Sequence, residues 1–489
     1  MRSWSLDDLR EALEQCIGKD PPPVGVGERA FPRLGPGLFL ERYRILCYLQ
    51  TADLAEIRSL TPVDCLQEAL PVPSVPCRDT LSLLSHPLLG EACLRPPAGT
   101  RLLVYRETPA LRDLARENRW TLLANPSELR ARWENKLWFR ARLRDMDLPV
   151  PPWESLSVED LRPETYRRLH RAWGAHLVVQ IPDFPRGGGR STFFVEHEEG
   201  LDGLRLQLAQ GRHRGHPFQE VLVSSLVEGP SLSIEGCVTP WGVIISPLQV
   251  QLVDLKEVLP VGRGGRFCGH QWGVPEFPPG VEATARRMVQ RVGDALMAEG
   301  YRGIFGLDLA LDECRGDLYA LECNPRYTGA FPALTILQLA VGLLPLEAFH
   351  LLGLLGSPKP VSAVNETGER MPAASQLLLF HRGSSPRQVC GSLQAGRYKW
   401  EDSRGKARVV GNVLPLSPPP WDPMEFLILD GPPPVGTLLL PGDELERVVR
   451  LLFLKPVAQD NGRLDPTVVR VIRWVYDCLG LGDAPGDGP

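Results

Sequence analysis

The clearest pattern of apolar and polar residues in the first part of the chain is that of a strand, a helix and a second strand. The apolar runs 101–105 (RLLVY) and 120–125 (WTLLAN) flank residues 108–118, which have helical periodicity. This order and spacing is typical of a βαβ unit, whose two strands are parallel. Nearer the start, Ser5 and Asp8 have the spacing of a capping box, and the apolar stripe that follows predicts an amphipathic helix.

The pattern changes to that of β-hairpins and one long helix in the middle of the chain. Residues 176–182 and 192–197 predict two strands joined by a glycine-rich loop, and residues 231–253 predict a hairpin that turns near Pro240. Residues 281–299 predict an amphipathic helix. Its apolar face consists of Val281, Ala285, Met288, Val292 and Leu296.

Five more helices are expected from periodicity and flanking residues. Ser127 is expected to cap a polar helix that carries Lys136. The most apolar run, residues 333–356, also contains proline, glutamate and histidine, which favours a buried helix pair over a membrane span. Near the C-terminus, residues 443–454 and 466–480 are expected to form two helices.

Composition restricts the class of protein. The chain of 489 residues is too long for one compact core, and its 43% hydrophobic and 23% charged residues are typical of a soluble protein. A net charge of −5 disfavours nucleic-acid binding. The 11 cysteines contain no C-x-x-C pair, so the tightest group, Cys65, Cys77 and Cys93, predicts free thiols in a reducing compartment rather than a metal site. The N-terminus is not that of a signal peptide, and a soluble, cytoplasmic protein without membrane partners is expected.

Two acidic residues are predicted to face each other across a hairpin. If residues 307–326 turn at Arg315, Asp308 lies directly opposite Glu322, with Cβ atoms roughly 5 Å apart. The second strand then presents four side chains on one face: Leu318, Ala320, Glu322 and Asn324. Carboxylates on a rigid sheet suit Mg²⁺, which completes its shell with phosphate oxygens and water. The alternative is a pair of solvated surface acids.

A glycine-rich loop and a scarce lysine add candidate phosphate ligands. In residues 185–192 (PRGGGRST), backbone N–H groups could approach a phosphate closely, and Arg186 and Arg190 add positive charge. The glycines concerned are Gly187, Gly188 and Gly189. The spacing is neither that of a Walker loop nor that of a Rossmann loop, so a flexible hairpin tip is the alternative. Lys136 is one of only seven lysines and could bind a phosphate as a point charge, or could be an ordinary surface lysine.

Taken together, the order and spacing of these motifs resemble the ATP-grasp superfamily. The matching segments are ENK (134–136), LPVPPW (148–153), VVQIP with RGGGRST (178–192), VSSLVEGPSLSIEG (223–236) and FGLDLALD with LECNPR (305–326). The LECNPR end is most similar to the branch of carbamoyl-phosphate synthetase and biotin carboxylase. The resemblance implies an α/β fold class with three domains. These are an N-terminal parallel-sheet α/β domain (1–126), a two-subdomain, α+β ATP-grasp core (127–356) and a C-terminal α+β domain (357–489).

The resemblance also implies which residues contact the nucleotide. Lys136 matches the first nucleotide-binding lysine of the family. Gln180 stands where most members have a second lysine, and Arg186 or Arg190 could compensate for that difference. Ser231 stands where many members have an acid that contacts the ribose. The hinge whose backbone contacts adenine matches residues 224–227, which include Ser225, Leu226 and Val227.

The same resemblance assigns the metal and the reacting groups. Asp308, Glu322 and Asn324 match the Mg²⁺ ligands, with Mn²⁺ as a possible substitute, and Arg326 together with Asn324 matches the catalytic positions that steady the transferred group. A loop at residues 262–273 is expected either to reach the site with His270 and Gln271 or to be a plain surface loop.

The function implied is an ATP-dependent, ADP-forming ligase. In this family a carboxylate is activated as an acyl phosphate and is then attacked by an amine, so the partners are small molecules, with a homodimer as one option for assembly. Two alternatives stay open: a phosphotransferase that stops at a phosphorylated product, and a non-catalytic nucleotide-binding homologue. Gln180 and Ser231, which depart from the family pattern, keep the second alternative open.

Overall fold

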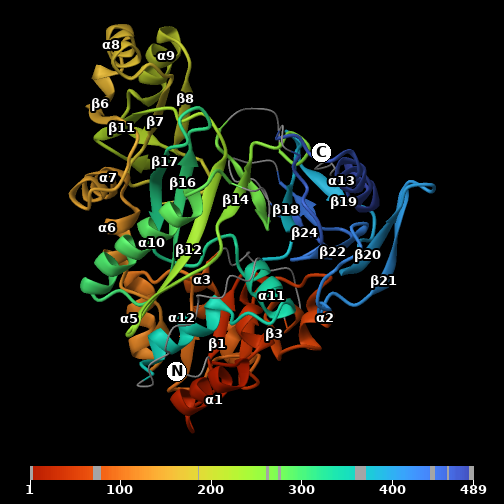
Figure 1. The fold of residues 1–489 in the computed structure, drawn as a ribbon. Coiled ribbons are helices and arrows are strands. Elements are labelled where there is room, and N and C mark those ends of the chain that lie inside the picture. The colour runs from red at the N-terminus through yellow and green to blue at the C-terminus, as the bar shows by residue number, and fades with distance from the viewer. Residues whose placement is uncertain are drawn as a thin grey trace, which may run out of the picture.

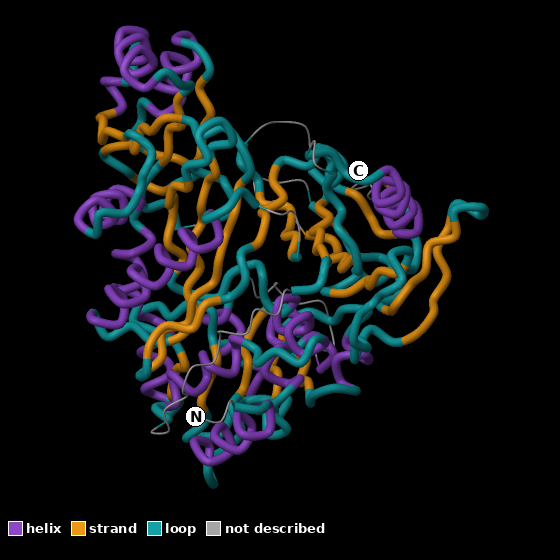
Figure 2. The backbone as a smooth tube through the Cα atoms, viewed as in Figure 1, coloured by secondary structure: helices purple, strands orange, loops and turns teal. Residues whose placement is uncertain are grey.

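The computed structural model describes residues 4–69, 79–185, 187–259, 264–273, 277–357, 371–440, 447–459 and 462–483. The N-terminal region lies at one end of the molecule, and a small sheet with two helices lies at the opposite end (Figure 1). A large sheet lies between them and continues into the C-terminal region, with most helices on the outside (Figure 2). The fold is therefore a mixed α/β fold, as predicted.

The N-terminal region contains a five-stranded sheet in the order β3-β2-β1-β4-β5. Every neighbouring pair is parallel, and β4, α5 and β5 form the predicted βαβ unit. Helix α1 begins at the predicted capping box, in which Asp8 N–H donates to the Ser5 hydroxyl. The bounds are α1 Leu6–Ile17, β1 Val24–Gly27, β2 Arg44–Cys47, α2 Leu54–Arg58, β3 Val63–Cys65, α3 Thr80–Leu84, α4 Leu88–Glu91, β4 Arg101–Leu103, α5 Pro109–Glu117 and β5 Thr121–Leu123.

Three cysteines of this region differ in their surroundings. Cys65 is a buried free thiol at the end of β3, whereas Cys93 is an exposed free thiol. Cys77 lies outside the described residues.

The helix expected after Ser127 is two helices, α6 Ser127–Glu134 and α7 Lys136–Asp145. Ser127 does not cap α6, because it is the first residue of the helix and Pro126 stands at the cap position; the backbone N–H of Ser127 donates to the Glu107 carboxylate of the preceding region. Asn135 separates the two helices, and its side chain accepts from Trp138 N–H as the cap of α7. Because Asn135 is the cap, Lys136 is the first residue of α7. Its side chain extends from this end of the helix to the edge of the site described below.

The small sheet has four antiparallel strands in the order β6-β11-β7-β8. Helices α8 and α9 pack against it in one hydrophobic cluster that includes Leu169, Leu201 and Val223. The predicted strands at 176–182 and 192–197 correspond to β7 and β8. The bounds are β6 Trp153–Ser157, α8 Pro163–Trp173, β7 Leu177–Gln180, β8 Thr192–Val195, α9 Glu198–Leu208, β9 Arg212–His213, β10 His216–Pro217 and β11 Glu220–Ser225.

The large sheet follows the order β17-β16-β12-β14-β15-β18-β24-β22-β20-β21, with β13 paired to β12 outside this path. The predicted hairpin at 231–253 is thus three strands, since the nine-residue β12 is long enough to pair with β13 at one end and β14 at the other. The predicted loop at 262–273 contains instead the strand β15, which is largely buried. The bounds are β12 Ser231–Thr239, β13 Gly242–Ile245, β14 Gln249–Val253, β15 Phe267–Trp272, α10 Val281–Ala298, β16 Gly303–Leu311 and β17 Leu318–Asn324.

Helix α10 covers one face of this sheet and buries the apolar stripe predicted for it. Beyond β17 the predicted helix pair is present as α11 and α12, which pack against the N-terminal region in one cluster. No helix in the described ranges is long and apolar enough to cross a membrane. The bounds of these two helices are α11 Ala333–Ala340 and α12 Leu346–Leu355.

The prediction of a helix at 443–454 is wrong over its described part, because residues 447–453 form the strand β24. β24 lies between β18 and β22, so both of its edges are paired, and residues 448–453 are buried in succession, so both of its faces are covered as well. A continuous apolar run fits such a strand as well as a buried helix. Residues 443–446 lie outside the described residues, and the other predicted helix is present as α13. The bounds are β18 Ala374–Phe380, β19 Arg387–Val389, β20 Gly396–Glu401, β21 Lys406–Gly411, β22 Glu425–Leu429, β23 Leu438–Leu439, β24 Arg447–Phe453, α13 Pro466–Leu479 and β25 Leu481–Asp483.

A buried acid in α12 should make the stability of the protein depend on pH. Glu347 is 1% exposed, and its Oε2 accepts from the Thr335 hydroxyl at 2.6 Å. Burial raises the pKa of Glu347 from 4.5 to about 7. Because the folded-state pKa is the higher one, the stabilising contribution is complete below about pH 4.5 and is lost as the pH rises through 7.

We therefore expect Glu347→Gln to be more stable than the parent at pH 8, by on the order of 3 kcal/mol, and closer to it at pH 5. Glutamine keeps the oxygen that accepts from Thr335. Urea unfolding at both pH values measures the difference. Glu117→Gln, at an exposed position in α5, is the control and should leave the pH dependence unchanged. An equal change of stability with pH in Glu347→Gln and the parent would contradict the expectation.

Candidate active site

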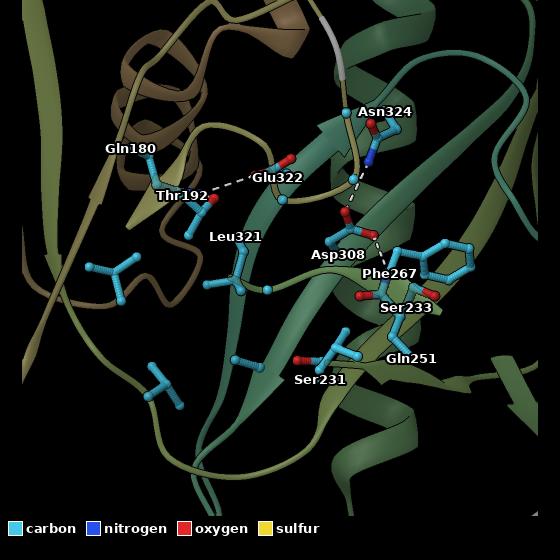
Figure 3. A pocket seen from close by; sticks show the side chains of 18 of the residues that line it. Gln180, Thr192, Ser231, Ser233, Gln251, Phe267, Asp308, Leu321, Glu322 and Asn324 are labelled. Atoms are coloured by element: carbon cyan, nitrogen blue, oxygen red, sulfur yellow. Dashed lines mark hydrogen bonds between the residues drawn. The ribbon is translucent and has the colours of Figure 1, made fainter. Parts of the chain in front are cut away.

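A cavity of about 370 Å³ lies between the small sheet and the large sheet (Figure 3). Its walls come from β7, β8 and β11 on one side and from β12, β14, β15, β16 and β17 on the other. This volume is within the range of small-molecule sites. The predicted site residues that line it are Gln180, Gly187, Gly188, Gly189, Ser225, Leu226, Val227, Ser231, Asp308, Glu322, Asn324 and Arg326.

Three predicted residues are placed differently from these. Lys136 lines a smaller adjoining cavity, together with the glycine loop, Glu322 and Arg326. Arg190 is absent from the described lining of both cavities. Arg186 lies outside the described residues.

The two acids at the floor of the cavity face each other across β16 and β17. The strand register pairs Asp308 with Glu322, as predicted from the hairpin. The prediction that one face of β17 carries all four of its side chains is wrong, because Leu321 is an extra residue at a β-bulge next to this pair. Beyond the bulge the alternation reverses, so Leu318 and Ala320 enter the core while Leu321 faces the cavity.

Each acid has its own hydrogen-bond partners. Asp308 accepts from Gln251 Nε2 at 2.7 Å and from Asn324 Nδ2 at 3.0 Å. Glu322 Oε1 lies 3.3 Å from Lys136 Nζ and accepts from Gln180 Nε2 at 3.2 Å. Lys136 and Gln180 therefore converge on the same oxygen of Glu322.

The residues at this floor fit a magnesium ion that is shared with a phosphate. Among the described residues no group of three or more His, Cys, Asp and Glu side chains is placed to hold a metal ion alone. Mg²⁺ is usually bound through one or two carboxylates, with waters and substrate phosphates completing its shell. Burial and the neighbouring Glu322 raise the pKa of Asp308 to about 7 even though Lys136 lies beside Glu322, so a further cation at this floor would favour the ionised form of Asp308. Two carboxylates and the Asn324 amide oxygen match that incomplete shell.

The glycine loop approaches the cavity in a conformation that larger residues cannot adopt. Gly188 and Gly189 have φ values of 79° and 75°. A Cβ atom on Gly189 would lie 2.2 Å from the carbonyl oxygen of Gly265, so this position has no room for a side chain. Gln180 Nε2, at the end of β7 beside the loop, also donates to Thr192 Oγ1 at 3.1 Å.

Arg326 is oriented by acceptors on two sides. Its Nε donates to Glu134 Oε1 and its Nη2 donates to Asn324 Oδ1, both at 2.7 Å. Burial acts to raise the pKa of Glu134, but Arg326, Arg106 and Arg130 lower it overall, so this carboxylate stays ionised. Glu134 and Asn324 thus hold the guanidinium group of Arg326 against the cavity.

Two of the hinge residues have backbone N–H groups that already donate to other parts of the protein. Ser225 N–H donates to Pro152 O at 2.9 Å, and Leu226 N–H donates to His176 O at 2.7 Å. In the described part of the chain no backbone oxygen accepts from Val227 N–H. Of the three hinge residues, Val227 therefore keeps a backbone donor that a ligand can use.

Sequence reasoning missed Glu235 and Gln251 in the lining of the cavity. Glu235 is 1% exposed, and burial raises its pKa to about 8. The alternation of polar and apolar residues in SLSIEG could have identified Glu235, because it places Ser231, Ser233 and Glu235 on one face of a strand. All three line the cavity from β12. Gln251 gave no comparable signal, since its role depends on the pairing of β12 with β14.

The predicted loop residues separate because β15 is a strand. His270 lines the cavity, whereas the Gln271 side chain is on the other face and accepts from Val457 N–H at 2.9 Å. Consecutive residues of a strand point to opposite faces, so only one of the two can reach the site.

Comparison with known proteins gives matches in structure but not in sequence. No protein-family model and no curated protein sequence matches the chain. The biotin carboxylase domain of Hydrogenobacter thermophilus 2-oxoglutarate carboxylase, in complex with MgADP, ADP and bicarbonate, has a TM-score of 0.60 at 13% identity, covering 90% of this chain and 87% of that one. Thermotoga maritima phosphoribosylamine–glycine ligase has a TM-score of 0.54 at 16% identity, covering 94% and 96%. Rhizobium etli pyruvate carboxylase has a TM-score of 0.57 at 14% identity, covering 89% and 36%.

These neighbours define the class of fold. The chain has the fold of these biotin carboxylase and phosphoribosylamine–glycine ligase structures, which confirms the fold implied by the resemblance to the ATP-grasp superfamily. At 13–16% identity the similarity establishes the fold and leaves the reaction open.

Proposed function

We propose that the protein is an ATP-dependent, ADP-forming ligase that joins a carboxylate to an amine. The observation that carries this proposal is the opposed pair Asp308 and Glu322 at the floor of the cavity. Lys136 and Arg326 lie beside this pair, and the glycine loop lines the same cavity. Acids that would hold a cation and basic groups on either side are what a phosphoryl transfer requires, since catalysis of that step is mostly positioning and charge neutralisation.

In this proposal the side of the small sheet binds the nucleotide. The phosphates contact Lys136, Gln180 and the glycine loop, with Arg186 and Arg190 as further candidates. The backbone of Ser225, Leu226 and Val227 contacts adenine, and the free donor of Val227 supports that assignment. Ser231, whose side of β12 faces the cavity, contacts the ribose.

The side of the large sheet carries out the chemistry. Asp308, Glu322 and Asn324 would hold Mg²⁺, or Mn²⁺ in its place, and the ion would supply neutralising charge to the phosphates. A carboxylate oxygen of the substrate attacks the γ-phosphorus and ADP leaves; the amine nitrogen then attacks the acyl carbon, phosphate leaves and the nitrogen loses its proton. Arg326 steadies the negative oxygens in both steps, and its contact with Glu134 supports that role by fixing its direction.

The competing functions make different products. A phosphotransferase forms ADP with the first substrate alone, and a non-catalytic homologue forms none. Gln180, which departs from the family pattern, donates to Glu322 and so lies beside the proposed metal site. Release of ADP and phosphate from ATP, measured with fractions of a metabolite extract, should require one carboxylate fraction and one amine fraction together. Release over many turnovers with either fraction alone, or none with any pair, would contradict the ligase, since its first step by itself frees at most one ADP per enzyme.

Mg-ATP is expected to raise the melting temperature of the protein. A ligand that binds only the folded state stabilises it by roughly 2.7 kcal/mol at a hundred times its Kd. Differential scanning fluorimetry with millimolar Mg-ATP measures the shift, and Mg²⁺ with AMP, which lacks the β- and γ-phosphates, is the control. An unchanged melting temperature with Mg-ATP would contradict nucleotide binding at this cavity.

The remaining proposals concern organisation. We propose the domain boundaries 1–126, 127–356 and 357–489, although strand β18 of the last region pairs with β15 of the second. We also propose a homodimer, since the Hydrogenobacter neighbour is a dimer. Light scattering on the purified protein measures the mass, and a monomer at micromolar concentration would contradict the dimer.

A further inference from the structure

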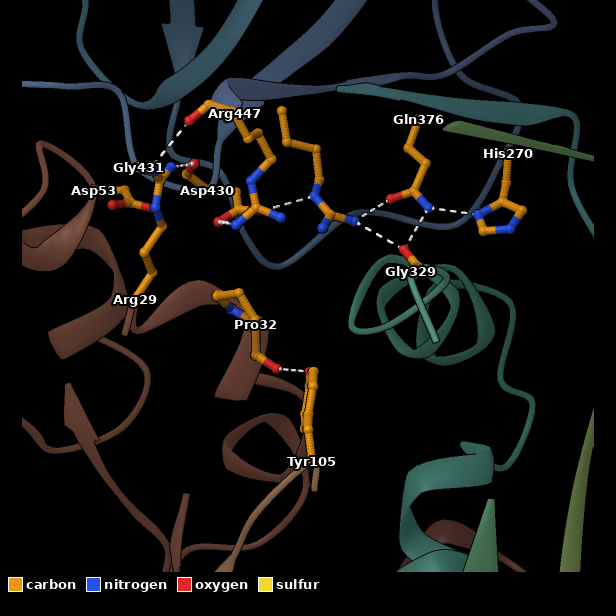
Figure 4. Close-up of polar contacts among 11 residues, drawn as sticks. Arg29, Pro32, Asp53, Tyr105, His270, Gly329, Gln376, Asp430, Gly431 and Arg447 are labelled. Atoms are coloured by element: carbon orange, nitrogen blue, oxygen red, sulfur yellow. Dashed lines mark hydrogen bonds and ion pairs between the residues drawn. The ribbon is translucent and has the colours of Figure 1, made fainter. Parts of the chain in front are cut away.

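A row of polar side chains leads from the cavity into the C-terminal strands. His270 on β15 lies directly opposite Gln251 on β14, whose side chain donates to Asp308. On its other side His270 lies opposite Gln376 on β18. The row therefore connects the proposed metal site with a buried ionic cluster around Asp430. Figure 4 shows its part from His270 through Gln376 to this cluster.

The orientation of the Gln376 amide is fixed by two neighbours of opposite character. Arg450, which can only donate, contacts Gln376 Oε1. The carbonyl oxygen of Gly329, which can only accept, lies 2.8 Å from Gln376 Nε2. A flipped amide would place donor against donor at one contact and acceptor against acceptor at the other. The amide nitrogen must therefore be the atom that faces His270.

This orientation determines the protonation of the His270 ring. Gln376 Nε2 lies 2.8 Å from His270 Nδ1, so Nδ1 accepts and carries no hydrogen. Burial and the charge of Arg450 lower the pKa of His270 to about 3, which keeps the ring neutral. The single ring hydrogen is thus on Nε2. In the described part of the chain Nε2 has no hydrogen-bond partner, and the ring lines the cavity.

Arg450 is itself held in place by the ionic cluster. Its Nε donates to Asp430 Oδ2 at 3.0 Å, and Arg447 Nη2 donates to Asp430 Oδ1 at 3.0 Å. Arg29 of the N-terminal region donates to the backbone oxygens of Asp430 and Arg447. Asp430 is fully buried, yet these three arginines lower its pKa and keep it ionised. Arg450 Nη1 also donates to the carbonyl oxygen of Gly329 in the middle region at 3.2 Å, so all three regions of the chain contribute to the position of one guanidinium group.

We propose that His270 Nε2–H is a fixed donor that binds an oxygen of the carboxylate substrate, and that Arg450 and Gln376 are positioning residues that hold the ring in this tautomer. The identification of the ligand rests on the proposed function, which requires a carboxylate and an amine. A protonated amine offers only donors, so the N–H of His270 discriminates in favour of the carboxylate. The location fits, because His270, Phe267 and Gly329 lie outside the residues proposed for the nucleotide.

The tautomer can be observed without any substrate. Protein labelled with ¹⁵N-histidine gives two-bond ¹H–¹⁵N correlations that distinguish Nε2–H, Nδ1–H and the imidazolium, and His270→Gln identifies the signal of His270. We expect Nε2–H at pH 7 and no change down to pH 5. Gln376→Glu presents a carboxylate to Nδ1, so the ring should carry a hydrogen there. Gln394→Glu, at an exposed position, is the matched control and should leave the signal unchanged. Nδ1–H or imidazolium in the parent would overturn the proposal.

The ligand is tested with two probes in the presence of Mg-ADP. Sodium acetate should shift the Nε2 resonance of His270, whereas methylammonium chloride at equal ionic strength should not. Gln376→Glu should lower the affinity for acetate by roughly tenfold or more, because the variant loses the hydrogen bond from His270 Nε2–H to the charged carboxylate. A shift with methylammonium alone, no shift with acetate, or equal acetate affinity in Gln376→Glu and the parent would overturn the proposal. These signals do not depend on turnover, so they separate this inference from the ligase assignment, which the ADP assay tests.

Discussion

Glu322→Gln is expected to lower ATP turnover by roughly a hundredfold or more, while the metal-free protein unfolds at the same or a higher temperature. Glu322 pairs with Asp308 across β16 and β17, and the pKa of Asp308 is raised to about 7 by burial and by this neighbour. Removing one negative charge relieves the repulsion in the absence of metal. The same change removes a charged ligand from the place where the ion and the phosphates are expected to meet.

Glutamine makes this test sharp because it preserves the local contacts. Its amide oxygen can still accept from Gln180 Nε2 and Lys136 Nζ, which lie 3.2 and 3.3 Å from Glu322 Oε1. Turnover is measured as ADP release with the substrates found in the extract assay, and stability by thermal unfolding with EDTA. Glu313→Gln changes an exposed acid of the same hairpin and should behave like the parent in both measurements. Near-parental turnover in Glu322→Gln would show that this hairpin does not hold the catalytic metal.

Lys136→Met is expected to weaken Mg-ATP binding by about 10- to 100-fold, the range for loss of a hydrogen bond to a charged group. Lys136 begins α7, where the Asn135 cap directs it to the small cavity that Glu322, Arg326 and the glycine loop also line. Methionine keeps most of the apolar stem, so the variant separates loss of the charge from loss of packing.

The affinity is measured by isothermal titration of Mg-ATP, and folding by circular dichroism. Lys19→Met removes an exposed lysine elsewhere and controls for the change in net charge. A variant at Lys136 that binds Mg-ATP as tightly as the parent would contradict the placement of this side chain on a phosphate. An unfolded variant would instead show that the contact with Glu322 is needed for the fold.

The sequence by itself determined the elements whose signals are local. The capping box at Ser5, the βαβ spacing at 101–125 and the apolar stripe of α10 depend on residues close together in the chain, and all three are present. The pairing of Asp308 with Glu322 is predicted from a turn centred on Arg315, but the pairs nearer the turn, such as Leu309 with Ala320, are shifted by one residue, and the bulge restores the predicted pair. The bulge at Leu321 could not be predicted, since it adds one residue without any mark in the composition.

The tertiary structure decided the features that depend on residues distant in the chain: the type of one element, the direction of side chains in β15 and the protonation of one ring. The run at 447–453 is a strand because β18 and β22 pair with both of its edges, whereas its apolar pattern also fits a helix. His270 reaches the cavity and Gln271 does not, because β15 is paired on both edges and its side chains must alternate. The tautomer of His270 depends on Gln376 and Arg450, more than 100 residues away. Local periodicity records which residues are apolar, but a hydrogen-bond partner supplied by another strand exists only after the sheet has formed.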